Sequence, residues 1–346
     1  MAEPLLAPAA DDPDRWRRRA ISISGVLLGS WALVAAALPL LLVSLLLELV
    51  RPRKLAATRA LLMFGVYLGC ELLGLLGAGW IALTTSGAAL VEASYILQRR
   101  WNSALSGALS ALFNLTWDVQ GLDACRPGPT LLLVRHASTA DTILPVALLS
   151  AGLGQKLRYV LKSELLWDPC IDVIGQRVPN VFVRRGDAGE VERVRALARG
   201  LGADESVVLY PEGTRYSPAR QAARLAELQN QPEDIQALAR ALQVTLAPKP
   251  GGVLAILDAE PTLDVVFCAH TGLEGARTLA DLVRGELVDK VVKVRFERVP
   301  AAEIPTDPAE RYRWLLARWG ALDEWIRAQR QDTTAKVVVS GGPQSP

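Results

Sequence analysis

The sequence predicts an α/β domain, with a largely parallel sheet flanked by helices, preceded by an N-terminal two-helix membrane hairpin. Two long apolar runs lie before residue 91, and short strand-like runs alternate with helical patterns after about residue 114. Such alternation is typical of parallel sheets whose faces are covered by helices. We therefore divide the chain into a basic N-terminal tail (1–20), a membrane helical hairpin (21–90), an amphipathic bridging helix (91–116), an α/β domain (117–331) and a disordered tail (332–346).

The hairpin prediction rests on the length of the two apolar runs. Residues 21–47 carry no charge, and residues 60–90 are interrupted only by Glu71. As a helix, the first run would be about 40 Å long, enough to cross a hydrocarbon core of roughly 30 Å and too long for a signal peptide. We expect Pro39 to bend this helix. We expect Glu71 to face the partner helix, to be protonated or to lie near an interface, because a carboxylate facing lipid is costly.

Basic residues set the expected orientation of the hairpin. They are more numerous at its outer ends than in its connecting loop, which favours a cytoplasmic location for both ends and for the following domain. The outer residues are Arg15, Arg17, Arg18, Arg19, Arg99 and Arg100, and those of the loop are Arg51, Arg53, Lys54 and Arg59. Between positions 96 and 113 apolar residues recur at helical spacing, so we expect a helix that bridges hairpin and domain, and a helix lying in the membrane interface is the alternative.

The rest of the chain contains five predicted strands, which are short runs rich in β-branched residues. They cover residues 130–136, 180–185, 206–210, 263–268 and 290–299. Helical patterns occupy residues 190–201, the segment that Pro232 opens, and residues 308–330. Because this part has its own strand and helix pattern, its core need not include the hairpin.

Composition argues against several classes of protein. The net charge is only +2, which disfavours a nucleic-acid-binding surface. The four cysteines lie far apart and form no CxxC pair, so we expect neither a disulfide framework nor a zinc site.

His136 is the first candidate for chemistry. It ends the apolar strand in LLLVRHASTADTILP, where α/β domains place reactive side chains, and Asp141 follows shortly after it. A carboxylate holds a histidine in one tautomer and makes it a better general base. This spacing also occurs by chance. We interpret His270, the other histidine, as structural.

A second cluster follows the strand at 206–210, in VLYPEGTRYSP. Glu212, Gly213, Thr214 and Arg215 place a carboxylate, a flexible turn, a hydroxyl and a guanidinium side by side, a set that suits a phosphorylated substrate. An ordinary turn with an exposed ion pair is the alternative.

Two further stretches end or follow predicted strands. Arg184 and Arg185 close the strand in VFVRRG and also suit an anion, although a solvated charge is the common role of such a residue. Residues 246–252 (LAPKPGG) predict a rigid, turn-rich loop at another strand end.

Together, these clusters resemble the lysophosphatidate acyltransferase family, the membrane-bound glycerolipid acyltransferases with an H-x4-D box. His136 and Asp141 match that box, and YPEGTR, ending at Arg215, matches the family's F/Y-P-E-G-T-R motif. Residues 181–185 match a hydrophobic strand that ends in Arg, and residues 246–252 resemble a proline-containing fourth motif. Lys162 in LKSELL also fits the family. The resemblance covers about residues 117–331.

The resemblance implies an enzyme that moves a fatty acyl group from acyl-CoA or acyl-carrier protein to the free hydroxyl of 1-acyl-glycerol-3-phosphate, giving phosphatidic acid. His136 would be the general base and Asp141 would orient it, without a covalent acyl-enzyme. The implied substrate-binding residues are Arg185 and Arg215 for the phosphate, Glu212 and Gly213 for the glycerol, and also Thr214, Lys162 and Pro248. No cofactor and no metal are implied. The implied partners are membrane lipids, the lysophospholipid acceptor and the thioester donor.

The chain departs from the family in three places. Tyr216 follows the Glu-Gly-Thr-Arg box, with Ser217 one position later. Arg135 stands where the family usually has Asn before the histidine, which would alter the charge around the base or the headgroup, and APKPGG lacks the usual Arg. Two alternatives therefore stay open: an acyltransferase or transacylase for another lysophospholipid headgroup, and a non-catalytic membrane lipid-binding scaffold.

Overall fold

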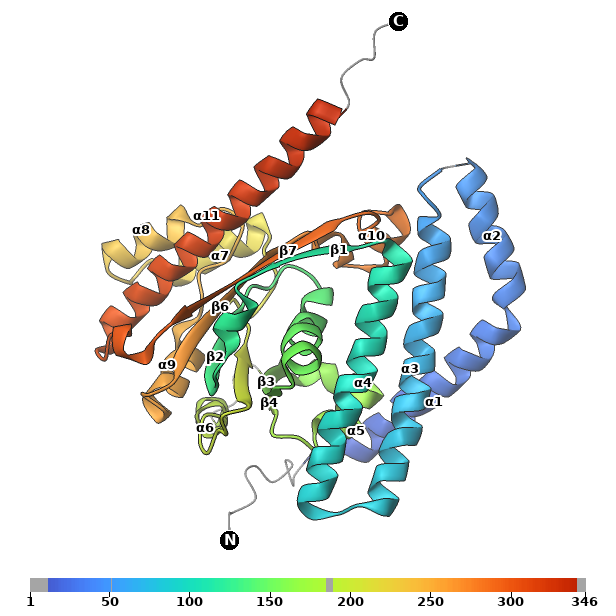
Figure 1. Cartoon of the computed structure of the whole chain (residues 1–346), viewed down its shortest axis with the longest axis horizontal. Coiled ribbons are helices and arrows are strands. Elements are labelled where there is room, and N and C mark those ends of the chain that lie inside the picture. The colour runs from blue at the N-terminus through green and yellow to red at the C-terminus, as the bar shows by residue number, and fades with distance from the viewer. Residues whose placement is uncertain (1–11, 51, 185–188, 341–346) are drawn as a thin grey trace, which may run out of the picture.

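The structure is a computed structural model that describes residues 12–50, 52–184 and 189–340. Its helical N-terminal part lies beside a sheet that carries further helices (Figure 1). The sheet has seven strands in the order β1-β7-β6-β2-β5-β3-β4. The strands are β1 (Thr116–Gln120), β2 (Thr130–Val134), β3 (Lys156–Lys162), β4 (Val181–Val183), β5 (Glu205–Leu209), β6 (Asp264–Thr271) and β7 (Val291–Val299).

Neighbouring strands run parallel, except that β6 and β7 are antiparallel. The predicted fold class, a largely parallel sheet flanked by helices, is confirmed. The five predicted strands correspond to β2, β4, β5, β6 and β7. The prediction missed β1, which is a short edge strand, and β3, whose sequence KLRYVLK carries charges along its length. Arg158 of β3 is nevertheless buried, because Glu205 pairs with it at 2.5 Å.

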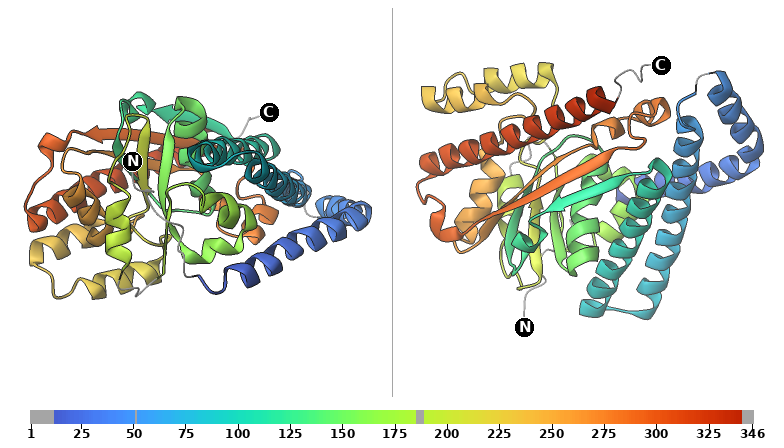
Figure 2. Two further views of the ribbon diagram at one scale, coloured as in Figure 1. Left: turned by 90° about the horizontal axis from the view of Figure 1, so that it is seen from below. Right: turned by 45° about the horizontal axis from the view of Figure 1, so that its top comes forward.

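Both faces of the sheet are buried, as expected where helices cover a parallel sheet. Side chains alternate along β2, so that Leu131 and Leu133 belong to one hydrophobic cluster, and Leu132 and Val134 to another. Figure 2 shows helices on the two sides of the sheet. Those that follow β1 in the chain are α5 (Pro169–Gly175), α6 (Glu190–Ala196), α7 (Pro218–Glu227), α8 (Glu233–Ala241), α9 (Pro250–Ala259), α10 (Leu279–Arg284) and α11 (Pro308–Ser340).

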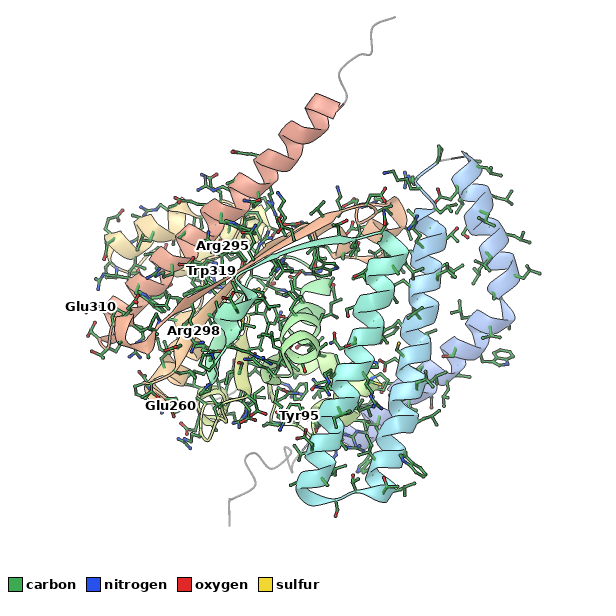
Figure 3. All side chains as sticks on the ribbon, viewed as in Figure 1. Tyr95, Glu260, Arg295, Arg298, Glu310 and Trp319 are labelled. Carbon is green, nitrogen blue, oxygen red and sulfur yellow. The ribbon has the colours of Figure 1, made fainter. Side chains whose placement is uncertain are left out.

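Helix α11 closes one face of the sheet. Its Trp319 is fully buried and lies with its ring centre 6.4 Å from that of Phe267 on β6 (Figure 3). The helix continues to Ser340, which corrects the predicted disorder of residues 332–346 as far as position 340. After Gly320, which lies inside the helix, no glycine or proline occurs until GGP at 341–343, so residues 321–340 contain no helix breaker. Residues 341–346 lie outside the described residues.

The N-terminal part contains four helices in the described residues, α1 (Arg15–Ala35), α2 (Ala37–Val50), α3 (Ala56–Thr84) and α4 (Gly87–Phe113). Helices α1 and α2 meet at an angle of 68°. Pro39 lies in the first turn of α2, where its missing N–H and its ring limit continuation of α1. Helix α3 is long and apolar enough to cross a membrane, and α1 with α2 would make a second span if the bent pair formed one.

The hairpin is not separate from the α/β core, contrary to our expectation. Ala56 and Ala60, in the first turns of α3, belong to the same hydrophobic cluster as Leu132 of β2. Leu109 and Phe113 of α4 join this cluster too. The start of α3 is small and apolar, so it packs close to the sheet domain instead of facing lipid. Helix α4 begins at Gly87, before the expected boundary at residue 91.

Polar contacts also tie the N-terminal helices to the rest of the chain. Arg18 of α1 donates from Nε to Asp172 of α5 at 3.0 Å, and Lys54 pairs with Asp289 at 2.5 Å. Glu71 is fully buried, and its Oε2 accepts a 3.1 Å hydrogen bond from the backbone N–H of Cys170 on α5. The carboxylate therefore faces the α/β part and not the partner helix.

Candidate active site

The candidate residues collect at one edge of the sheet. Strands β2, β3, β4 and β5 are mutually parallel, so their carboxyl ends share that edge. His136 follows β2, Lys162 ends β3, Arg184 follows β4, and the loop that begins at Tyr210 follows β5. Open α/β sheets bind their ligands at this edge.

His136 and Asp141 are in contact, which the spacing of the two residues suggested but did not prove. The Nδ1 atom of His136 lies 3.3 Å from Oδ2 of Asp141. The imidazole is partly exposed, whereas Asp141, in the short helical turn Ala140–Ile143, is fully buried. With Nδ1 turned toward the carboxylate, Nε2 is the nitrogen left for a substrate.

Asp141 is held ionised by the loop around it. Its carboxylate accepts hydrogen bonds from the N–H of Ala137, from the N–H of Ser138 at 2.7 Å and from the Ser138 hydroxyl at 2.7 Å. Burial acts to raise the pKa of Asp141. The charged form of the neighbouring His270 and the hydrogen bonds from His136 and Ser138 outweigh this effect, so the pKa of Asp141 lies below its ordinary value.

Tyr210 lies against the same pair, although the sequence pattern indicated no role for it. Its ring centre is 5.3 Å from that of His136, and its hydroxyl donates to the main-chain oxygen of Asp141 at 3.0 Å. Burial raises the pKa of Tyr210 well above its ordinary value, so the hydroxyl stays protonated and remains a donor. Its position at the head of the Y-P-E-G-T-R motif was the available signal.

Glu212 lies beneath the site and not in it. Its side chain is fully buried, and its two carboxylate oxygens accept the backbone N–H groups of His136 at 2.8 Å and Leu246 at 2.7 Å. Burial raises the pKa of Glu212 to about 7 against these hydrogen bonds. The residue therefore joins two loops, and its geometry suits positioning better than the glycerol contact that the resemblance implied.

The rest of this motif forms a turn. Gly213 has a φ of +66°, a conformation that favours glycine. Its N–H donates to the main-chain oxygen of Tyr210 at 3.0 Å. Thr214 is partly buried. Arg215 is also partly buried and donates from its guanidinium to the main-chain oxygen of Arg277 at 2.6 Å, which places its charge beside the loop after β6.

Three other predicted binding residues differ in their placement. Lys162 is exposed at the sheet edge. Pro248 is buried, and its oxygen accepts from the Tyr312 hydroxyl of α11 at 3.4 Å. Its segment precedes α9 and follows no strand, so the expected strand-end loop is corrected: Pro250 begins a helix there instead of a turn. Arg185 lies outside the described residues.

Arg135 is buried in the interior of the protein. It is 1% exposed, and its guanidinium pairs with Glu274 at 2.8 Å and donates to the main-chain oxygen of His270 at 2.6 Å. Arg135 and Arg330 of α11 share the Glu274 carboxylate, and together they lower the pKa of Glu274 against the effect of burial.

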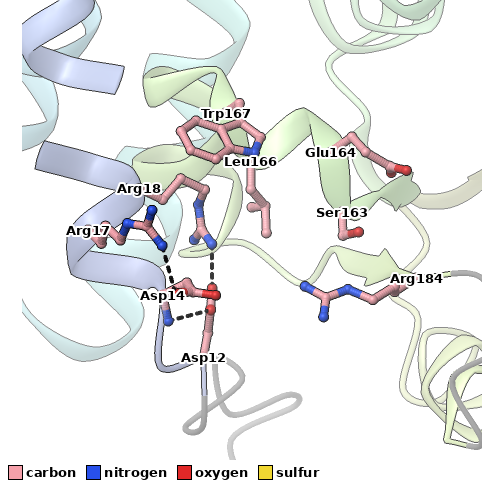
Figure 4. A pocket seen from close by; sticks show the side chains of 9 residues that line it. All are labelled: Asp12, Asp14, Arg17, Arg18, Ser163, Glu164, Leu166, Trp167 and Arg184. Carbon is pink, nitrogen blue, oxygen red and sulfur yellow. Dashed lines mark hydrogen bonds and ion pairs between the residues drawn. The ribbon is translucent and has the colours of Figure 1, made fainter. Parts of the chain in front are cut away.

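A cavity of about 410 Å³ opens beside the ends of β3 and β4 (Figure 4). Arg184 and Ser163 line it on the sheet side, and Arg17 and Arg18 of α1 line it on the other. Arg18 is held by Asp12 at 2.6 Å as well as by Asp172. The N-terminal helix thus forms one wall of the cavity nearest the strand ends.

Within the described ranges, no three His, Cys, Asp or Glu side chains gather in a way suited to a metal ion. These residues therefore offer no candidate metal site. That the enzyme needs no cofactor stays a prediction.

The fold and the strand-edge His–Asp pair define a class of protein. Residues 116–263 match the family model described as "Acyltransferase", so this part of the chain is an acyltransferase domain. The resemblance found from the motifs is confirmed at this level.

One solved structure gives a particular relative. The chain is similar to the 1-acyl-sn-glycerophosphate (LPA) acyltransferase PlsC from Thermotoga maritima, with 13% identity and a TM-score of 0.55, over 80% of this chain and 96% of that one. At this identity, the likeness establishes the shared fold. A search of curated proteins found no match to the sequence.

Proposed function

We propose that this protein transfers a fatty acyl group from acyl-CoA, or from acyl-carrier protein, to the free hydroxyl of 1-acyl-glycerol-3-phosphate. The product is phosphatidic acid. The observation that carries the proposal is the 3.3 Å contact between His136 and the buried Asp141 at the carboxyl edge of an acyltransferase domain.

In the proposed reaction, Nε2 of His136 takes the proton of the acceptor hydroxyl while its oxygen attacks the thioester carbonyl. Asp141 keeps the other ring nitrogen protonated and stabilises the charged imidazole that forms. The C–O bond forms, the C–S bond breaks, and the proton passes from His136 to the leaving thiolate. The acceptor supplies the alcohol, so no covalent acyl-enzyme forms.

The choice of a phosphate-bearing acceptor rests on charge at the same edge. Arg215 follows β5, and Arg184 and Arg17 line the cavity beside β3 and β4. Guanidinium groups bind phosphate oxygens in pairs of hydrogen bonds. The similar protein from Thermotoga maritima is a 1-acyl-sn-glycerophosphate acyltransferase, which supports the proposal. Arg185 is included in the proposed phosphate site only because it matches the family motif.

We further propose that the protein acts at a membrane, with the catalytic domain on the cytoplasmic face. Acceptor and product are both lipids, and α3 is long and apolar enough to cross a membrane. Many large side chains of α1, α2 and α3, such as Trp31, Leu49 and Leu83, are exposed in the chain alone and would be covered by lipid.

One assay tests the proposal. Purified protein in detergent is given acyl-CoA and a panel of lysophospholipids, and free thiol and lipid product are both measured. Thiol release that requires lysophosphatidate supports the proposal. Release with another headgroup, or acyl transfer from a phospholipid without thiol release, would favour the alternative enzymes, and no transfer at all would favour a lipid-binding scaffold.

A further inference from the structure

His270 lies directly behind the catalytic pair. It sits near the carboxyl end of β6, the strand beside β2, and its side chain is fully buried. Its Nε2 atom is 2.9 Å from the main-chain oxygen of Arg135 and 3.8 Å from Oδ1 of Asp141.

The hydrogen bond to Arg135 sets the tautomer of this ring. A main-chain oxygen only accepts, so Nε2 of His270 carries the hydrogen. Burial lowers the pKa of His270, so the ring is neutral and Nδ1 is left as an acceptor. Nδ1 has no hydrogen-bond partner among the described residues, which costs about 1–3 kcal/mol for a buried polar atom. Packing alone therefore does not explain a histidine at this position.

The oxygen that His270 binds belongs to the peptide unit that leads into His136. The carbonyl of this unit accepts from His270, and its N–H donates to Oε1 of Glu212 at 2.8 Å. One peptide plane is thus held at both ends by buried side chains. Arg135 reinforces the arrangement, because its guanidinium donates back to the main-chain oxygen of His270 at 2.6 Å.

We propose that His270 is a positioning residue: it fixes the peptide unit before His136 and so directs the imidazole toward Asp141. The proposal rests on the proposed function, in which His136 is the base. A small rotation of this peptide would turn the ring away from Asp141, and misplacement of a catalytic group by about 1 Å costs on the order of 10²-fold in rate.

Two amide substitutions test whether the hydrogen bond from His270 to the main-chain oxygen of Arg135 matters, or only the presence of a polar side chain. His270→Gln places its NH2 near the position of Nε2 and keeps the donor to Arg135. His270→Asn places its NH2 near the position of Nδ1 and loses that donor. We expect His270→Asn to lower kcat by roughly 10- to 100-fold with little change in KM for either substrate, and His270→Gln to recover most of the loss.

Val266→Ala is the matched control for loss of packing. Val266 is fully buried on the same strand, away from His136. The control should lower Tm but leave kcat near that of the natural protein. If Val266→Ala lowered kcat as much as His270→Asn does, the proposal would be overturned. Equal losses of kcat in His270→Gln and His270→Asn would overturn it too.

Histidine NMR gives a second measurement that does not depend on the reaction. The chain has only two histidines, so in either His270 variant the labelled imidazole signal comes from His136 alone. We expect one sharp signal at the natural position in His270→Gln and a shifted or broadened one in His270→Asn. An unchanged signal in His270→Asn overturns the positioning role even if the acceptor proves to be another lipid. Failure of the natural protein to use lysophosphatidate would refute the proposed acceptor alone.

Discussion

The imidazole of His136 is oriented by side chains that are buried beneath it. Asp141 contacts its Nδ1, Glu212 accepts the N–H of its own backbone, and the Tyr210 ring lies against it. These groups are themselves held by hydrogen bonds, so the geometry is set before a substrate arrives. Preorganisation of this kind lowers the cost of reaching the transition state.

Removing the base tests the mechanism most directly. We expect His136→Ala to lower turnover by at least ~10²-fold, the scale of general-base catalysis, while Tm stays close to that of the natural protein. Thiol release and Tm are measured on the same preparation. Near-normal turnover in a folded His136→Ala protein would refute the mechanism.

Asp141→Asn keeps the size of the side chain and removes its charge. The new NH2 would face a histidine nitrogen or backbone N–H groups, so we expect turnover to fall by ~10²-fold or more and Tm to fall at neutral pH. The folded pKa of Asp141 lies below its ordinary value of 3.8, so its contribution to stability is present above that value and is lost as pH falls through the folded pKa.

Tm measured from pH 7 down to pH 3 checks the sign of this effect. The Tm advantage of the natural protein over Asp141→Asn should narrow at the acid end of the range. An advantage that grows on acidification would show that the carboxylate is not stabilised by the loop.

Arg215→Ala tests the phosphate site. We expect KM for lysophosphatidate to rise by roughly 10-fold or more, because a charge-assisted contact is lost, and KM for a lysolipid with a neutral headgroup to change little. Arg199→Ala is the control, since Arg199 is an exposed arginine that pairs with Glu192. Equal losses for the two acceptors would mean that Arg215 serves the fold through its bond to Arg277, or serves the donor.

At the scale of elements, α11 holds the loop that supports Glu212. Asp323 of α11 is almost fully buried and accepts the N–H groups of Gln243, Val244 and Thr245 at 2.9–3.1 Å. The next N–H along the chain, that of Leu246, reaches Glu212. Helix α11 thus supports the site indirectly: Asp323 holds the segment up to Thr245, and the adjacent Leu246 contacts Glu212. The helix does so although it lies outside residues 116–263, which match the family model.

Asp323→Ala should therefore cost both stability and activity. The N–H groups of Gln243, Val244 and Thr245 and the buried Thr245 hydroxyl lose their acceptor. We therefore expect the free energy of unfolding to fall by about 3 kcal/mol, with a clear drop in Tm and in turnover. Arg327→Ala is the matched control on the same helix, because Arg327 pairs with the other oxygen of Asp323 near the surface. Its effect should stay below about 1 kcal/mol. Similar effects of the two substitutions would contradict the bracing role.

At the scale of the whole molecule, the hairpin and the catalytic domain form one packed body. Helices α3 and α4 share a hydrophobic cluster with the sheet, and Arg18 of α1 reaches α5. The same N-terminal helix lines the cavity beside Arg184. The N-terminal helices are therefore part of the structure around the site, in addition to the membrane attachment that we propose for them.

Deleting residues 1–90 tests whether the N-terminal helices and the sheet domain form one packed body. The deletion removes Ala56 and Ala60 from the shared cluster and leaves Asp172 and Asp289 without their partners from the hairpin. We expect the truncated protein to aggregate and to lose activity even on detergent-dispersed acceptor, whereas the full chain in the same detergent stays monodisperse. A monodisperse, active truncated protein would show that the hairpin serves only as an anchor.

The sequence by itself determined the class of fold and named the two residues, His136 and Asp141, that the fold brings into contact. Helices and strands form largely because of the local pattern of apolar residues, and this pattern can be read directly from the sequence. Five strands and the bend near Pro39 were therefore predictable. The His136–Asp141 pair was predictable because both residues lie in one loop, so their contact spans few residues. The charges of β3 hid its strand pattern, because its buried Arg158 is neutralised by a residue far along the chain.

Only the tertiary structure decided what the remaining polar residues do. Glu212 and Arg135 carry the chemistry of ligand-binding residues, yet the fold turns both inward, toward backbone groups and charges from β6 and α11. His270 is distant in sequence from His136, and adjacent strands bring it beneath the catalytic loop. Such contacts depend on strand order and helix packing, and spacing along the chain does not encode them. For the same reason, the packing of the hairpin against the sheet emerged only when the chain was folded.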